Sequence, residues 1–238
     1  MLSQFFEYAR YLKPVMKLFI AAFAVYPYIC LTLLTGGLLL RYTYAQEEWN
    51  ARSSQFLESR MLRCGSLIFH IGILLSLGGH IVGLVLPPEA LRAVCVSAQA
   101  HAQIAGLAGM LIAPMVLLGV GILLLRRIIC LPVRLTTRWT DIIVLLLIGF
   151  NAATGMYQAY AAHFDAFTTI GPWVRGILTL APAPGRMIHV PLFLQLHVLS
   201  GLTIFALLPF TRLVHIFSVP LSYVTFPFTI YRRRWGGV

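Results

Sequence analysis

Charged residues are scarce in this sequence of 238 residues, and acidic residues are the scarcest. Asp and Glu together number 7 and Lys and Arg 18, so charged residues make up 11% of the chain, whereas hydrophobic residues make up 59%. A soluble domain carries about 25% charged residues, because its surface must face water. The composition therefore excludes an ordinary soluble domain and a disordered chain, and it indicates a polytopic membrane protein.

The sequence also lacks any C-x-x-C pair. Its four cysteines stand singly along the chain, at positions 30, 64, 95 and 130. Iron–sulfur and zinc sites usually take their thiolates from closely spaced pairs, so this spacing excludes such a site. We interpret the cysteines as small apolar packing residues.

Five long apolar stretches are present, and each can cross a hydrocarbon core of about 30 Å. Continuous apolar runs in a membrane predict helices, so we expect an all-α fold, a bundle of five transmembrane helices. We interpret residues 1–17 as an interfacial segment and residues 220–238 as a cytoplasmic tail. The first apolar stretch is too long for a cleavable signal peptide, and no small-residue cleavage site follows it. The five stretches are residues 18–40, 66–86, 104–125, 142–162 and 190–219.

The basic residues predict the orientation of the bundle. Five spans place the two termini on opposite sides of the membrane. Twelve of the 18 Lys and Arg residues fall in the loop between the first and second spans, in the loop between the third and fourth, and at the C-terminal end. Basic residues collect on the cytoplasmic side, so we expect the N-terminus outside and the C-terminus in the cytoplasm. The net charge of +11 then reflects orientation, and no nucleic-acid partner is expected.

Four of the seven histidines lie within two of the apolar stretches. His70 and His80 are in the second span, and His197 and His215 are in the fifth. Because these two spans run antiparallel, His70 and His215 lie toward the cytoplasm, and His80 and His197 lie toward the outside. Polar residues at membrane depth are costly and usually functional. The four histidines are therefore expected to form two cross-helix pairs at two depths.

Two histidines that face each other inside a helix bundle are suited to bind a haem iron from both sides, so we predict a haem at each pair. Arg212 is a candidate contact for a haem propionate. The spacing agrees only in part, since ten helical residues rise about 15 Å and eighteen rise about 27 Å; a kink at Pro209 reduces the mismatch. The alternative is that the histidines only make hydrogen bonds within the bundle. The nearby glycines, which would admit a flat macrocycle, are Gly72, Gly78, Gly79, Gly83 and Gly201.

The other three histidines, His101, His163 and His189, lie near the predicted outer boundary. Histidine is common there as an amphipathic interface residue. The functional alternative is a quinol site, because quinol oxidation needs a group that accepts a proton near neutral pH. Asp165 is an outer carboxylate that would assist.

Two histidine-bearing blocks resemble the gamma subunit of respiratory nitrate reductase, the membrane-embedded dihaem cytochrome b of that complex. The resemblance covers the chain after about residue 20. The first block is Arg41-Tyr-Thr-Tyr-Ala-Gln46, Trp49, Ala51, Ser53-Ser-Gln55, Phe69-His-Ile-Gly-Ile-Leu74 and Gly79-His80. The second is Leu196-His197, Pro209-Phe-Thr-Arg-Leu-Val-His215 and Ser218-Val-Pro220.

The resemblance implies that His80 and His197 bind the outer haem iron, and that His70 and His215 bind the inner one. It also implies two partners, a cytoplasmic iron–sulfur (beta) subunit and a molybdopterin catalytic (alpha) subunit that reduces nitrate.

One position departs from the family. A lysine associated with quinol binding usually stands at the outer end of the third span, which here falls near Ala100, beside His101. Either His101 takes over its role, or quinol binds differently, or the electron donor is not the usual quinol. The candidates for quinol contact are Gly79, His80, His101 and His189.

We therefore expect a quinol-oxidising subunit, using menaquinol or ubiquinol, in the inner membrane of a prokaryote. Electrons would reach the iron–sulfur subunit and protons would leave outside; the subunit alone would not reduce nitrate. The alternatives are a related cytochrome b anchor of a sulfur-metabolism or nitrite-oxidising complex, and a haem-free proton-coupled transporter.

Overall fold

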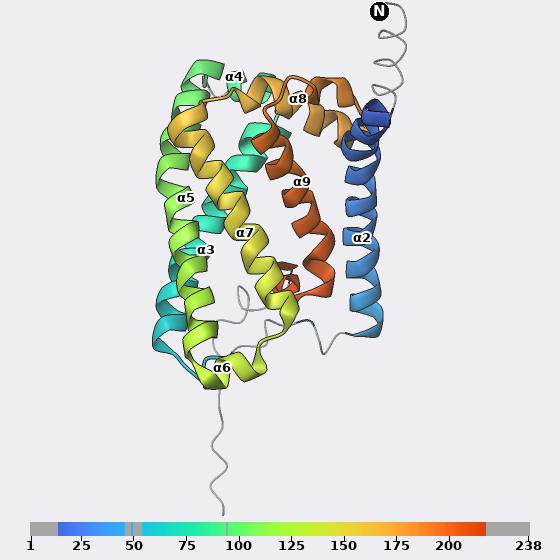
Figure 1. Ribbon diagram of the computed structural model, residues 1–238. Helices are drawn as coiled ribbons and strands as arrows, with labels where there is room; N and C mark the ends of the chain where they lie inside the picture. Colours follow the sequence, from blue (N-terminus) through green and yellow to red (C-terminus); the bar gives the residue numbers. More distant parts are fainter. Residues whose placement is uncertain (1–13, 46–48, 50–53, 94, 218–238) are drawn as a thin grey trace, which may run out of the picture.

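The protein is a bundle of five long helices that run side by side (Figure 1). The computed structural model describes residues 14–45, 49, 54–93 and 95–217. Each long helix is apolar and long enough to cross a membrane, which confirms the predicted five-helix fold. The five helices are α2 (Tyr26–Tyr44), α3 (Arg60–His80), α5 (Ala98–Ile129), α7 (Trp139–Tyr157) and α9 (Leu192–Leu207).

Short elements join or extend the long helices. The helices α4 (Pro88–Ala93) and α8 (Ala166–Leu178) lie at one end of the bundle, called here the α8 end, and α6 (Leu131–Thr136) lies at the other, the α6 end (Figure 1). Most of the predicted N-terminal segment and the whole predicted tail, 220–238, fall outside the described residues. The remaining elements are the π-helical turns η1 (Ala21–Val25), η3 (Ile81–Val85) and η4 (Gln158–Ala162), and the 3₁₀ turns η5 (Pro184–Met187), η6 (Leu208–Phe210) and η7 (Arg212–Phe217).

Close packing of α3 on α5 holds the helix that carries two of the histidines. A methyl group added at Gly119 would lie 2.7 Å from the Cα atom of Phe69, and one at Gly72 would lie 2.9 Å from Val116. Small residues let helix backbones approach in a membrane, where neighbouring helices gain little from the hydrophobic effect. The core cluster around Phe69 extends this contact to α7 through Val120 and Ile148.

The fifth helix is shorter than its apolar stretch predicts. We expected a span over 190–219, but α9 ends at Leu207, and the chain continues as two 3₁₀ turns separated by extended Thr211. Pro209 is the second residue after the helix and cannot donate the backbone hydrogen bond that would continue it. The change of direction at this point places His215, as shown below.

The helix α8 closes one end of the bundle and was not predicted. Trp173 donates a hydrogen bond from its ring nitrogen to the Phe23 carbonyl (2.9 Å), and Arg175 donates to the Leu84 carbonyl (3.2 Å). These bonds tie α8 to the start of the first span and to η3. The core cluster at this end is Phe23, Ile170, Trp173, Ile177, Met187, Val190 and Leu194.

A buried arginine fastens the loop before α3 at the α6 end. Arg126 is completely buried and pairs with the Glu58 carboxylate (2.6 Å), and it also donates to the carbonyls of Ser54 (3.0 Å) and Glu58 (2.8 Å). Arg126 is one of the basic residues that predict the orientation of the bundle, but its whole guanidinium is used inside the chain.

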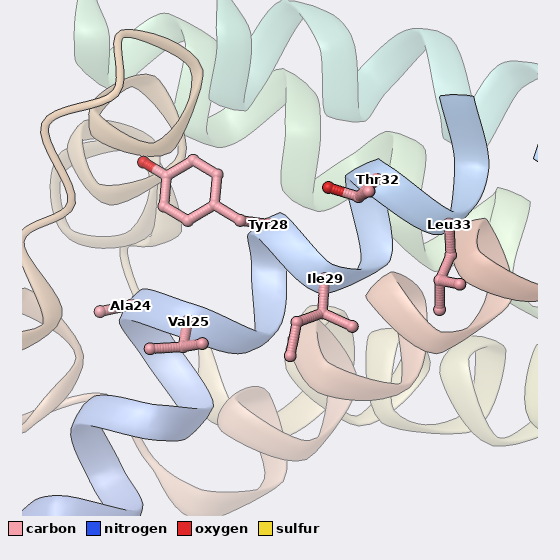
Figure 2. Close-up of a pocket in the computed structure, with 6 residues that line it drawn as sticks. All are labelled: Ala24, Val25, Tyr28, Ile29, Thr32 and Leu33. Carbon is pink, nitrogen blue, oxygen red and sulfur yellow. The ribbon is translucent and has the colours of Figure 1, made fainter. Parts of the chain in front are cut away.

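Side chains along the first span form a shallow apolar groove (Figure 2). Val25 and Ile29 are half exposed there. Exposed aliphatic side chains are expected on a helix face that meets lipid acyl chains. The groove is lined by Ala24, Val25, Tyr28, Ile29, Thr32 and Leu33.

Candidate functional site

The structure brings His80 and His197 together near the α8 end. His80 is the last residue of α3, and His197 lies in the second turn of α9. Their imidazole rings face each other with centroids 5.9 Å apart and planes only 13° apart.

His70 and His215 form the second pair, toward the α6 end. Their ring centroids are also 5.9 Å apart, and their planes are 59° apart. His70 is ten residues, or about 15 Å of helix, before His80 on α3. His215 comes from η7, so its position is set by the 3₁₀ turns rather than by α9.

All four histidines have their Nδ1 atom engaged in a hydrogen bond. His70 and His80 bond to carbonyls one turn earlier, at Ser66 and Ser76 (both 2.7 Å). A carbonyl only accepts, so these Nδ1 atoms carry the hydrogen and the Nε2 atoms keep a free lone pair. None of the four Nε2 atoms makes a hydrogen bond within the described residues.

The other histidine of each pair also has its Nδ1 atom in a hydrogen bond. His215 bonds through Nδ1 to the Arg212 carbonyl (2.6 Å). His197 bonds to the Thr154 hydroxyl (2.8 Å), which itself donates to the Phe150 carbonyl (2.9 Å) and so accepts from His197. A ligand histidine characteristically uses its other nitrogen in this way, which fixes the tautomer and the ring orientation.

The spacing of each pair fits one metal ion held between two imidazoles. With metal–nitrogen bonds of about 2 Å, two rings in trans have centroids about 6 Å apart. In the described part of the chain no group of three or more His, Cys, Asp or Glu side chains could hold a metal. Each pair offers only two imidazole nitrogens, so a metal ion between them would need its further ligands from a cofactor, as haem iron has.

Only two of the five nearby glycines face open space. A methyl group added at Gly78 or Gly79 would meet no atom within 4 Å, so the backbone beside His80 is accessible to a flat ligand. Gly72 instead packs on α5, and a methyl group added at Gly83 would lie 3.4 Å from the ring of His101. The sequence-based interpretation of Gly72 as a macrocycle contact is therefore wrong.

Arg212 is engaged within the chain. Its guanidinium pairs with the buried carboxylate of Asp141 (3.0 Å), and its carbonyl accepts the bond from His215. The predicted propionate contact of Arg212 stays a prediction.

The ring of His101 lies close to the turn that directly follows His80, since a methyl group added at Gly83 of that turn would lie 3.4 Å from it. Its ring also packs on Phe167 of α8, with centroids 4.6 Å apart. The Nδ1 atom of His101 is buried and has no hydrogen-bond partner among the described residues. It is therefore an unpaired polar atom inside the described part of the protein.

The remaining outer candidates are less closely placed. His163 is exposed and ends η4 with a left-handed backbone conformation (φ 47°). His189 is exposed after η5. Asp165 caps α8 by accepting from the Thr168 backbone (3.2 Å) and hydroxyl (2.6 Å), so its carboxylate has a structural use.

Sequence reasoning missed the residues that hold the imidazoles. Thr154 lies on the fourth span and would not be linked to His197 from the sequence. For Ser66 and Ser76 a local signal existed, since each precedes its histidine by four residues, one helical turn.

The fold and the site define a multi-pass membrane protein with two interhelical histidine pairs stacked along a five-helix bundle. Comparison with known proteins then identifies the family: the model for the nitrate reductase gamma subunit matches residues 20–234. The chain belongs to this family.

Three relatives match over nearly their whole length. The nitrate reductase gamma chain of Bacillus subtilis is 37% identical, and the match covers 88% of this chain and 96% of the relative. The respiratory nitrate reductase 2 gamma chain of Escherichia coli is 35% identical, over 88% of this chain and 95% of the relative. The respiratory nitrate reductase 1 gamma chain of the same organism is 34% identical, over 89% and 96%.

Proposed function

We propose that the chain is the membrane cytochrome b subunit of a respiratory nitrate reductase. In this proposal it oxidises quinol near the α8 end and delivers electrons to an iron–sulfur subunit at the α6 end. The observation that supports it most is the pair of facing histidines at each of two depths, each histidine with Nδ1 bonded and Nε2 free. Family membership supports the nitrate reductase assignment.

His70 and His215 would hold one haem b, and His80 and His197 the other. Bound haem b supplies one-electron redox chemistry, which a two-electron donor such as quinol needs in order to pass its electrons singly. The protein's own contribution is to orient four imidazoles through their Nδ1 bonds and to keep the sites within an apolar bundle.

The proposed quinol contact is His101, with Gly79 and His80 beside it. The buried Nδ1 atom of His101 would accept the proton of a quinol hydroxyl as the electrons leave. The helix α8 packs over this end through Phe167 and limits the access of water to the ring. His189 is exposed and follows η5 by two residues, so it would contribute only at the rim of the quinol site.

The distribution of basic residues supports the α6 end as the cytoplasmic end, in the inner membrane of a prokaryote. The proposed partners dock there, an iron–sulfur subunit and a molybdopterin subunit that reduces nitrate. Proton release would then occur outside and nitrate reduction inside.

A redox difference spectrum of membranes that contain the chain tests the haem assignment. We expect b-type bands from two haems in the unaltered protein. His80→Ala should remove one haem, and His70→Ala should remove the other. His163→Ala is the matched control, since His163 is exposed and belongs to neither pair. Absence of b-type bands in the unaltered protein would overturn the proposal and favour a haem-free transporter. Co-purification without a molybdopterin subunit would instead favour a different complex.

Substitution of His101 tests the quinol site. His101→Leu removes the proton acceptor at nearly constant size, so we expect quinol-dependent reduction of both haems to slow by about 10²–10⁴-fold. His101→Lys keeps a titratable nitrogen and should retain much more activity. An unchanged rate in His101→Leu would place quinol oxidation elsewhere.

A further inference from the structure

The point at which α9 ends brings His215 to the level of His70. His197 and Leu207 are ten residues apart, the same helical rise as His70 to His80 on the partner helix. Were α9 to continue, His215 would lie about 12 Å beyond the level of His70. Instead the helix stops at Leu207, and the 3₁₀ turns bring the His215 ring to 5.9 Å from His70.

Helix α2 packs against the segment where α9 ends, although α2 carries no histidine. Gly37 is buried against Pro209: a methyl group there would lie 2.6 Å from Cγ of Pro209 and 3.0 Å from Cζ of Phe210. One turn further along α2, Arg41 donates a hydrogen bond to the Pro209 carbonyl and another to the Thr211 carbonyl (3.4 Å). Both carbonyls lie in the segment where the helical hydrogen bonds have been lost.

The break is fixed from the other side by α7. Asp141 is buried near the start of α7, where one carboxylate oxygen caps the helix by accepting from the Arg138 backbone (3.1 Å). The other oxygen pairs with Arg212 (3.0 Å), the residue whose carbonyl accepts the Nδ1 bond of His215. The segment from Leu208 to His215 is therefore held between two helices.

We propose that α2 is the positioning element for His215, acting through Gly37 and Arg41 on the break at Pro209. Each acts on the path of the main chain that carries the histidine. This inference rests on the proposed function, because it assigns to the first span the geometry of one haem site. Its consequence is selective, because His80 and His197 are oriented by hydrogen bonds to Ser76 and Thr154, which lie outside this segment.

Two neighbouring glycines provide a matched test. Gly37→Ala places a methyl group into Pro209, whereas Gly36→Ala, in the same turn of the same helix, meets no atom within 4 Å. Both variants would be made in the complete complex, in membranes. Haem content would be read from redox difference spectra, and axial-ligand geometry from the electron paramagnetic resonance signal of each ferric haem. The single-histidine variants described above assign the two signals.

We expect Gly37→Ala to shift or remove the signal of the His70–His215 haem and to leave that of the His80–His197 haem unchanged. Gly36→Ala should resemble the unaltered protein in both signals. Identical spectra for the two glycine variants would overturn the inference while leaving the proposed function intact, because both haems would still be present. Loss of both haems in Gly37→Ala would also overturn it, by showing a general packing defect.

Arg41 supplies an independent variant that does not rely on overpacking. Arg41→Met removes the donor at similar length, and Arg41→Lys retains one. We expect Arg41→Met to alter the His70–His215 signal alone and Arg41→Lys to restore it at least in part. An unaltered signal in Arg41→Met would show that the break holds its shape without α2.

Discussion

The hydroxyl of Thr154 lies 2.8 Å from Nδ1 of His197. Among the described residues, His197 is the only one of the four histidines whose Nδ1 partner belongs to a different long helix. His70, His80 and His215 bond to carbonyls within four residues of themselves. The orientation of His197 therefore depends on the packing of α7 on α9, whereas the other three are oriented locally.

Thr154→Val should raise the reduction potential of the haem that we assign to His80 and His197. Loss of the Nδ1 acceptor makes the imidazole a weaker electron donor to the metal and so disfavours the oxidised state. One hydrogen bond of about 0.5–1.5 kcal/mol corresponds to roughly 20–60 mV for one electron. Potentiometric titration measures it. Thr154→Ser keeps the hydroxyl and is expected to leave the potential near its original value; a shift of the other haem instead would refute the assignment.

Gly119→Ala should destabilise the bundle and disturb His70. The added methyl group would lie 2.7–2.8 Å from backbone and Cβ atoms of Phe69, the neighbour of His70. Overpacking of this kind typically costs about 1–3 kcal/mol. Gly121→Ala is the control, because a methyl group there meets no atom within 4 Å. Thermal unfolding of the purified protein in detergent measures the difference, and equal stabilities would show that α3 and α5 separate easily.

Arg126→Met should destabilise the loop before α3. The substitution removes a buried guanidinium that pairs with Glu58 and donates to two main-chain carbonyls. Hydrogen bonds to charged groups contribute about 1.5–3 kcal/mol each, so the total loss should reach at least about 2 kcal/mol. Arg92→Met breaks the exposed pair with Glu89, whose side chains are 68% and 70% exposed, and should cost less than about 1 kcal/mol. Proteolysis around residue 58 that is faster in Arg126→Met, but not in Arg92→Met, would support the prediction.

The stability of the same loop should fall in acid. Desolvation acts to raise the pKa of Glu58, but hydrogen bonds from the Met61 backbone, from Arg126 and from the Leu62 backbone outweigh it and hold the pKa below the ordinary value. A carboxyl group with a lowered pKa in the folded state stabilises the protein above its unfolded pKa. That contribution is lost as pH falls through the folded value.

Thermal unfolding over a pH series, with Glu58→Gln as the comparison, checks this dependence. We expect the difference between the two proteins to shrink as pH falls below about 4. A constant difference across the acid range would mean that the carboxylate does not contribute through its charge.

Much of the candidate site was accessible from the sequence. The pairing of His70 with His215 and of His80 with His197 followed from two antiparallel spans, each with one histidine toward either end. The path between His197 and His215 did not follow, because hydropathy continues past residue 210 without a sign of the 3₁₀ turns. Pro209 pointed to a kink, but its contact with Gly37 on the first span decided how far the chain turns.

The amphipathic helix α8 was missed for a similar reason. Its thirteen residues are too few to cross a membrane. They include Gly171 and Pro172, the two residue types with the lowest helix propensity, so the local sequence does not predict a helix. Contacts of Trp173 with Phe23 and of Arg175 with Leu84 supply the stability that local propensity lacks.

The sequence by itself determined that this is a membrane protein with five helical spans and histidines at two depths, since hydropathy and helical rise are properties of short contiguous segments. The tertiary structure decided which atoms orient those histidines, where α9 ends, and that Arg126 is buried rather than on the surface. These features depend on contacts between residues far apart in the chain, such as Thr154 with His197 and Arg126 with Glu58. Such contacts arise only when the helices pack in one particular register.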